Sequence, residues 1–183
     1  MHKDFPIERR CSHLADRFQL GFARKAMQLL PQGEETAFAP GPQGLVILAE
    51  TEMALERPVK ILSEVFGDQV RIGPPTIRYR RSAHSAASTE EPHMGLRVLC
   101  APACYDAVRR DLQLRKAVIL DAEVNRQFGI VRARAPLAAL IGYPDKLAEL
   151  TSGHGQLVMW LSHYETLEEP GSRSEERRVG KEC

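Results

Sequence analysis

Basic side chains are concentrated in one stretch that has the pattern of a helix end. The cluster consists of Arg109, Arg110, Arg115 and Lys116. Cationic groups placed together in this way can bind phosphate oxygens. Several aspartates lie nearby in the sequence, so the alternative is a charged face that is merely solvated. The residues alone leave both interpretations open.

A glycine-containing loop is the second segment whose composition could support binding chemistry. It consists of Thr151, Ser152, Gly153, His154 and Gly155. Glycine adopts backbone angles that other residues avoid, and successive N–H groups in such a loop can face an anion. We therefore expect this loop to lie beside the basic helix end and to share a phosphate contact with it.

Other residues with chemical potential form weaker patterns. Cys100 and Cys104 could begin a metal site, but no second cysteine pair follows them, and we expect an ordinary strand-end and helix-start pair. His163 is expected to pack at a strand end, and no nucleophile or paired carboxylate accompanies the histidines. Trp160 is expected in the core or on the sheet surface, with base stacking as the alternative. The sequence thus predicts no catalytic residue, no cofactor and no metal.

The C-terminal tail changes how the composition is interpreted. Residues 173–183, RSEERRVGKEC, match the translation of a common sequencing adapter, so we expect residues 171–183 to be an artefact. Removing the four basic and three acidic residues of 173–183 from the totals of 25 and 24 leaves 21 of each. A neutral chain lacks the overall positive field of a nonspecific nucleic-acid binder, so any RNA contact must be local.

The elements that must position these residues fall into two units. In residues 1–80, helical patterns alternate with strand patterns in the order (β)αββαβ, beginning with a weak strand and a helix capped by Ser12. Residues 81–92 are rich in Ser, Ala and Glu and are expected to be a linker. Residues 93–170 repeat the βαββαβ order. The fold class is therefore α+β, with two ferredoxin-like (βαββαβ) α/β sandwich domains in tandem.

The last expected strand, Gln156 to Tyr164, shows a clear two-residue period. Leu157, Met159, Leu161 and His163 are expected on one face, and the intervening residues on the other. No run of about 18 apolar residues is present, so we expect no membrane-spanning helix. Sparse cysteines and the lack of an apolar leader favour a cytoplasmic protein.

The second unit resembles the C-terminal domain V of the elongation factor G family. That family typically shows GY, a Leu, T-x-G-x-G and then an alternating strand that ends in H-Y. The matching residues are Gly142, Tyr143, Leu147, Thr151, Gly153, Gly155, His163 and Tyr164. His154 stands where the family usually has Arg.

The first unit resembles domain III of the same family. The family's G-M-G-E-L-H-L-E segment and later F-G, G-x-P and Y-R positions are matched here in part. The matches are Glu52, Leu55, Glu56, Phe66, Gly67, Val70, Gly73, Pro74, Tyr79 and Arg80. Ala54 replaces the family's His, and Ala49 and Thr51 replace its glycines. Domains III and V would thus be joined without domain IV between them, and without the GTPase domain or domain II.

The resemblance implies a non-catalytic role in translation. The chain has no G-x-x-x-x-G-K-[ST] loop, and Asn125 is its single Asn, so the family's N-K-x-D motif is absent. The expected partner is the ribosome, through ribosomal RNA and large-subunit proteins, or a translation factor; neither DNA nor a membrane is expected. The alternatives are a truncated or degenerate elongation factor fragment without activity, and a ferredoxin-like regulatory module that binds a small ligand.

Overall fold

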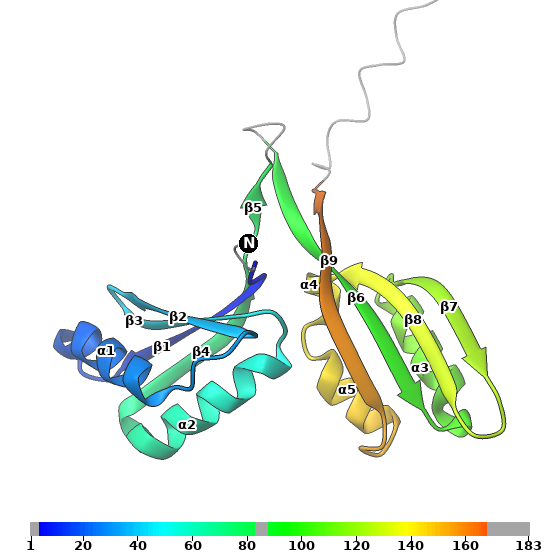
Figure 1. The fold of residues 1–183 in the computed structure, drawn as a ribbon, viewed down its shortest axis with the longest axis horizontal. Coiled ribbons are helices and arrows are strands. Elements are labelled where there is room, and N and C mark those ends of the chain that lie inside the picture. The colour runs from blue at the N-terminus through cyan, green and yellow to red at the C-terminus, as the bar shows by residue number, and fades with distance from the viewer. Residues whose placement is uncertain (1–3, 83–87, 168–183) are drawn as a thin grey trace, which may run out of the picture.

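Two α+β units make up the protein. The computed structural model describes residues 4–82 and 88–167. Each unit is an antiparallel sheet with its helices packed on one face, and the two units stand next to each other (Figure 1). This arrangement confirms the fold class expected from the alternating helix and strand patterns.

The first unit follows the βαββαβ order. Its strands are β1 Ile7–His13, β2 Thr36–Gly41, β3 Gly44–Ala49 and β4 Val70–Ile77. Its helices are α1 Gln19–Leu29 and α2 Glu56–Phe66, with 3-10 turns at Asp16–Phe18, Met53–Leu55 and Gly67–Gln69. The sheet order is β2-β3-β1-β4, and all neighbours are antiparallel. This order is the one expected of a ferredoxin-like unit.

The core of the first unit lies between the sheet and its two helices. Strand residues Ile7 and Leu45 are fully buried against helix residues such as Phe22 and Leu62. Burial of this apolar surface is the main favourable term in folding. Ser12 lies in β1 and does not cap a helix, because β1 extends to His13 and α1 begins only at Gln19.

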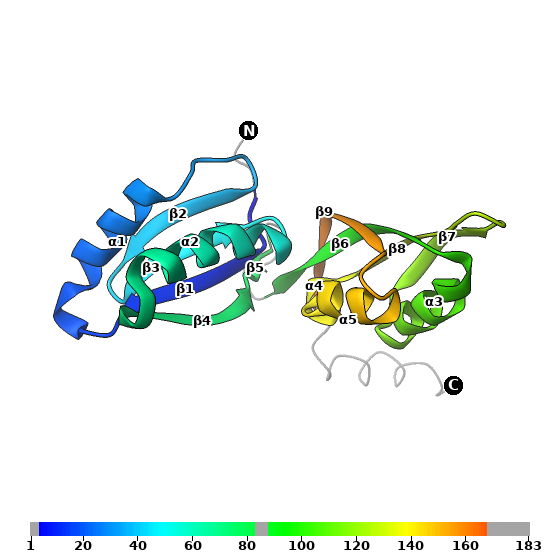
Figure 2. The ribbon, with the colours of Figure 1, turned by 90° about the horizontal axis from the view of Figure 1, so that it is seen from below.

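The second unit repeats this plan with a longer first strand. Its strands are β6 Thr89–Cys100, β7 Val118–Val124, β8 Gly129–Pro136 and β9 Gln156–Thr166. Its helices are α3 Tyr105–Leu114, α4 Leu137–Leu140 and α5 Tyr143–Leu150, with a 3-10 turn at Pro102–Cys104. β6 pairs with β8 on one edge and with β9 on the other, and β7 lies outside β8. The three helices cover one face of this sheet (Figure 2).

The segment expected to be a linker contains part of the second sheet. β5, Arg80–Arg81, pairs with Thr89 and Glu90 at the start of β6. β6 therefore begins inside residues 81–92, five residues before the strand expected from Met94. The start of β6 was not predicted because its residues are polar. The apolar alternation of β6 begins only after the residues that pair with β5.

A bulge in β9 overturns the expected face of His163. Met94 lies opposite Leu161, yet His93 lies opposite His163, so Ser162 is the extra residue. A one-residue insertion of this kind moves every later side chain to the other face. His163 consequently lies on the face opposite to Leu161, away from the helices.

Two expectations concern segments beyond this description. The artefact assigned to residues 171–183 lies outside the described residues, as do 83–87 within the expected linker. In residues 4–82 and 88–167, no helix is both long and apolar enough to cross a membrane.

Candidate functional site

The nine residues expected to contact RNA divide into two groups by exposure. Six are exposed: Arg109, Arg110, Lys116, Ser152, Gly153 and His154. Arg115 and Gly155 are half-buried, and Thr151 is buried. Within the described part of the chain, the guanidinium groups of Arg109 and Arg110 form no ion pair, so both are available to a ligand.

Arg115 is held inside the fold. Its Nε donates to Asp111 Oδ2 at 2.8 Å, and its Nη1 donates to the carbonyl oxygen of Ala139 in α4 at 2.8 Å. Its guanidinium carbon also lies 5.1 Å from the centre of the Tyr143 ring. Charge-assisted bonds of this kind are roughly twice as strong as neutral ones. Arg115 therefore joins α3 to the α4–α5 segment and is not a free phosphate ligand.

The basic helix end is a glycine-free Schellman cap. The N–H of Lys116 donates to Gln113 O at 2.9 Å, and the N–H of Ala117 donates to Leu112 O at 3.0 Å. Lys116 has φ 61°, the left-handed conformation that this motif requires. Its exposed ammonium thus lies beside the carbonyl end of α3, where the helix dipole favours a cation.

The glycine loop ends α5 in the same way. The N–H of Ser152 donates to Glu149 O at 3.4 Å, and that of Gly153 donates to Ala148 O at 2.8 Å. Ser152 has φ 51°. This loop is therefore a second Schellman cap.

The remaining N–H groups of the loop are also used internally. The buried hydroxyl of Thr151 donates to Leu147 O at 2.7 Å and accepts from the N–H of Gly155 at 2.8 Å. The N–H of His154 donates to Thr151 O at 3.0 Å. We expected these N–H groups to bind phosphate. That expectation is wrong for this conformation, because each N–H group already donates to an acceptor within α5 or its loop. What the loop presents is the side chain of His154.

The two segments lie at opposite ends of the second unit. α3 starts near the end of β6, after Cys100. At that end of β6, Leu99 lies opposite Gln156, the residue that follows the loop. α3 ends near Ala139 and near Val118, which lies opposite Arg134 towards the end of β8. A ten-residue helix is about 15 Å long. The loop is at the lower end of the unit in Figure 1, with the arrowhead of β6. The structure therefore does not bring the two groups together.

The upper end of the second unit contacts the first unit. Gly142 takes φ 73° between α4 and α5, and its N–H donates to Glu52 Oε2 of the first unit at 2.8 Å. A second contact is formed by Tyr164, whose ring centre lies 3.8 Å from the guanidinium carbon of Arg80; Nη1 of Arg80 in turn lies 3.8 Å from Asp4 Oδ2. Burial and Asp4 raise the pKa of Tyr164 to about 12. We call these contacts the junction.

Comparison with known proteins finds relatives that match most of this chain. The family described as "Elongation factor G C-terminus" matches residues 88–173. Elongation factor G of Aquifex pyrophilus is 28% identical over 177 residues, covering 81% of this chain and 25% of the relative. Elongation factor G 2 of Syntrophomonas wolfei is 34% identical over 93 residues, covering 49% and 13%.

The second unit is matched by the family model of the elongation factor G C-terminus. The resemblance of the chain to elongation factor G is confirmed, and the Aquifex alignment extends it into the first unit. A solved structure from Thermus thermophilus shares the fold over 91% of this chain and 42% of that one, with a TM-score of 0.61 and 15% identity. The chain spans about a quarter or less of the length of the curated elongation factors that it matches.

The second unit also exposes a distinct sheet face. Trp160 is 43% exposed and lies across Gly95, where a Cβ atom would come within 2.4 Å of the indole. Of the two positions expected for Trp160, core or sheet surface, the structure shows the sheet surface. On the same face Arg97 lies directly opposite Arg132, which is paired with Asp121. This face was not found from the sequence, because its residues come from three strands.

The two cysteines considered as a metal-binding pair lie at a strand end and at a helix start, as expected. Cys100 ends β6 and Cys104 belongs to the turn before α3. Burial raises the pKa of the Cys100 thiol, with Cys104 adding to the effect. Both thiols are free.

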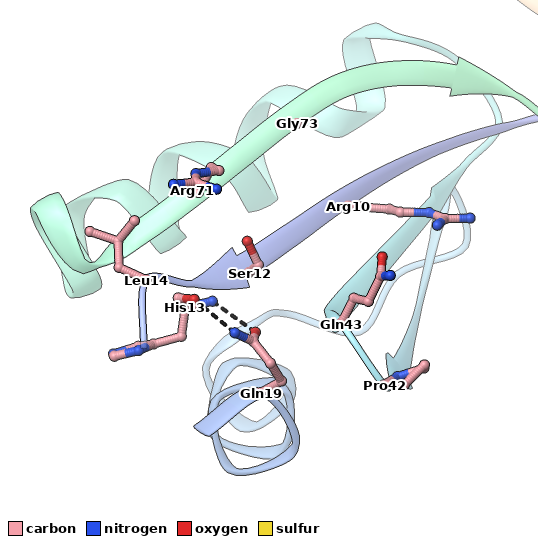
Figure 3. A pocket seen from close by; sticks show the side chains of 9 residues that line it. All are labelled: Arg10, Ser12, His13, Leu14, Gln19, Pro42, Gln43, Arg71 and Gly73. Atoms are coloured by element: carbon pink, nitrogen blue, oxygen red, sulfur yellow. Dashed lines mark hydrogen bonds between the residues drawn. The ribbon is translucent and has the colours of Figure 1, made fainter. Parts of the chain in front are cut away.

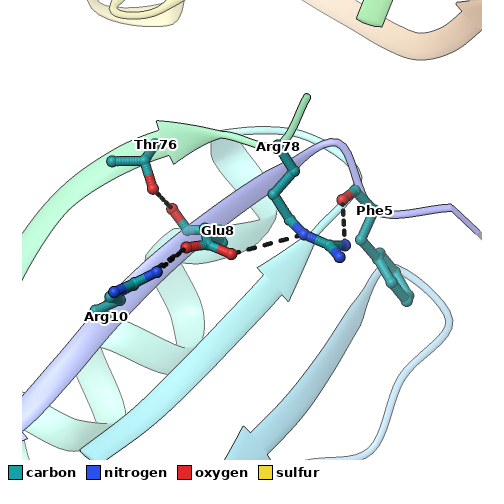
Figure 4. Close-up of polar contacts among 5 residues, drawn as sticks. All are labelled: Phe5, Glu8, Arg10, Thr76 and Arg78. Atoms are coloured by element: carbon teal, nitrogen blue, oxygen red, sulfur yellow. Dashed lines mark hydrogen bonds and ion pairs between the residues drawn. The ribbon is translucent and has the colours of Figure 1, made fainter. Parts of the chain in front are cut away.

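The first unit carries a large polar hollow. It has a volume of about 700 Å³ on the outer sheet face, with Arg10, Arg71, Gln43 and Ser12 among its lining residues (Figure 3). Arg10 is paired with Glu8 at 3.1 Å, and Arg78 approaches the same carboxylate at 3.6 Å (Figure 4). The hollow therefore carries one cation, Arg71, that has no partner among the described residues.

Proposed function

We propose that the chain binds the ribosome, or a translation factor on it, through its elongation factor G C-terminal domain and without catalysing a reaction. The match of the second unit to the elongation factor G C-terminus family carries the proposal. The relatives named above are elongation factors, and translation is the shared context. This role places the protein in the cytoplasm with the ribosomes.

The contact surface that we propose is the exposed side of α3 with its cap. Arg109, Arg110 and Lys116 are exposed to solvent and are free to meet phosphate oxygens of ribosomal RNA. His154, with Ser152 and Gly153, would form a separate contact at the other end of the domain. Arg115, Thr151 and Gly155 support these surfaces by holding the two caps.

Co-sedimentation with purified ribosomes at low salt tests this role. The parent chain is expected to pellet with ribosomes, and Arg109→Ala/Arg110→Ala is expected to lose most of that binding. The matched control is Arg24→Ala/Arg57→Ala, which removes two exposed arginines from the helices of the first unit. Failure of the parent chain to pellet would favour an inactive elongation factor fragment.

The hollow in the first unit favours a second candidate function, the binding of a small anionic regulator. Arg71 and Arg10 on neighbouring strands would supply the charge, and Gln43 and Ser12 the polar contacts. Calorimetric titration with inorganic phosphate tests it, with Arg71→Ala as the variant that should abolish binding. An absence of measurable heat with the parent chain would remove this candidate.

A further inference from the structure

Four side chains form a square on the outer face of the second sheet, at the end nearest the junction. His93 lies directly opposite His163, and Glu91 lies directly opposite Glu165. The two pairs are neighbours along β6 and β9, so all four side chains project from the same face. His93 and His163 come from strands far apart in the sequence, which is why no metal-ligand spacing was visible there.

The bulge in β9 creates this square. Without the bulge, His93 would lie opposite Ser162, and His163 would point to the helical side. Bulges often re-aim a side chain in this way. As a result the two imidazole rings approach to 5.2 Å between centroids.

The nitrogen and oxygen atoms of the square are spaced like the corners of a metal coordination sphere. His93 Nε2 lies 3.1 Å from Glu165 Oε2 and 3.6 Å from Glu91 Oε1, and His163 Nε2 lies 3.8 Å from Glu165 Oε2. Ligand atoms around a tetrahedral zinc ion are about 3.4 Å apart, given bonds of about 2.0–2.2 Å. One ligand atom from each of His93, His163 and Glu165 can be chosen within 4.8 Å of the others.

Two further features suit a cation. Glu91 and Glu165 are like charges in directly opposed positions, an arrangement that is unfavourable unless a positive charge lies between them. His163 Nδ1 lies 3.1 Å from Ser162 Oγ, so that ring nitrogen has its own partner and Nε2 is left for a metal. The Glu165 side chain is 60% exposed and leaves an entry path, whereas that of His93 is 14% exposed.

We propose that His93, His163 and Glu165 bind one divalent cation of the zinc class, with Glu91 or water as the fourth ligand. Imidazole and carboxylate together are a ligand set that zinc accepts. The site ties β6 to β9 beside Tyr164, and so reinforces the junction. This proposal does not depend on ribosome binding.

Calorimetric titration of the chelator-treated full chain with zinc chloride at neutral pH tests the site. We expect saturable binding of one ion with micromolar or tighter affinity and a rise in melting temperature. The visible absorption of bound Co²⁺ should report tetrahedral coordination. His93→Ala/His163→Ala should abolish all three signals, whereas the matched control His154→Ala should leave them unchanged.

A second variant distinguishes the loss of a metal ligand from a loss of folding. Glu165→Gln changes an exposed side chain that packs little, and it should weaken binding roughly tenfold or more while circular dichroism stays unchanged. Cys100→Ser/Cys104→Ser should bind as the parent does. The proposal is overturned if the parent shows no saturable binding, because the square is then only an imidazole–carboxylate network, or if the double histidine variant binds zinc as well as the parent.

Discussion

The two ends of the second unit carry similar caps but differ in what surrounds them. At the junction end, the cap of α3 is tied by Arg115 to α4, and the neighbouring Gly142 is bonded to Glu52 of the first unit. At the far end, the cap of α5 is held by the Thr151 hydroxyl, whose bonds stay within α5 and its loop. Arg115 therefore joins α3 to neighbouring elements, whereas Thr151 stabilises only the end of its own helix, although the sequence grouped both residues in one expected site.

Arginines of the same helix end also differ in their contacts. Arg109 and Arg110 have free guanidinium groups among the described residues, whereas Arg115, about one and a half turns later, uses its Nε and Nη1 donors within the fold. A free cation can exchange solvent for phosphate, but Arg115 would first have to break bonds that hold α3 in place. Binding and stability are therefore expected to respond to different substitutions.

The largest effect on stability is expected from Arg115→Ala, which removes the contacts that hold α3 at the junction end. It removes the pair with Asp111 and the bond to Ala139 O, and it uncovers the Tyr143 ring. We expect the second unit to lose about 2–3 kcal/mol of unfolding free energy, because hydrogen bonds to charged groups contribute strongly. Urea denaturation followed by circular dichroism measures this; a change within experimental error would show that Arg115 is not structural.

A smaller effect is expected from Thr151→Val at the far end. Valine keeps the shape but leaves the N–H of Gly155 without its acceptor, so we expect a loss of about 1–2 kcal/mol. Thr151→Ser keeps the hydroxyl and is the control. Should valine and serine prove equally stable, the cap would not depend on this hydroxyl.

Alkaline pH should weaken the junction, because the pKa of Tyr164 is raised there. The folded state raises the pKa of Tyr164 from 10.0 to about 12, so in this range the unfolded chain loses a proton that the folded chain keeps. Stability from this group is complete below the unfolded pKa and is lost as pH rises through the folded pKa. Comparing urea midpoints of the parent and Tyr164→Phe across that range isolates the effect, since the variant should show a shallower decline. Parallel curves would contradict it.

The smallest effect is expected from Ser152→Gly, and its sign is opposite. Ser152 occupies the left-handed position of the α5 cap with φ 51°, where glycine avoids steric strain. Part of the gain is offset by the greater flexibility of glycine in the unfolded chain, so we expect about 0.5 kcal/mol of stabilisation. Thermal melts of both proteins measure it, and a destabilised variant would mean that the serine side chain has an unrecognised contact.

Local patterns in the sequence predicted most of the fold. The last strand was expected at Gln156 to Tyr164 from its two-residue period, and β9 occupies Gln156–Thr166, because such a period is visible in neighbouring residues. The order of helices and strands along the chain was also expected, from the alternation of helical and strand patterns. These features need no knowledge of distant contacts.

Features that depend on register were not predictable. The bulge at Ser162 leaves no mark in the sequence, yet it decides which face His163 occupies. The partner of Arg115 is a backbone carbonyl of α4, and a carbonyl has no sequence signature. The separation of the basic helix end from the glycine loop was likewise not predictable, because it depends on how α3 and α5 pack on the sheet.

The salt dependence of ribosome binding tests the central claim most directly, namely that Arg109 and Arg110 meet phosphates while Arg115 holds the fold. Affinities of the parent and of Arg109→Ala/Arg110→Ala are measured over a series of salt concentrations. Each lost phosphate contact should lower the magnitude of the slope of log affinity against log salt by roughly 0.7–0.9. We expect the double variant to bind more weakly and with a slope that is shallower by about two such steps. An unchanged slope and affinity would contradict the account.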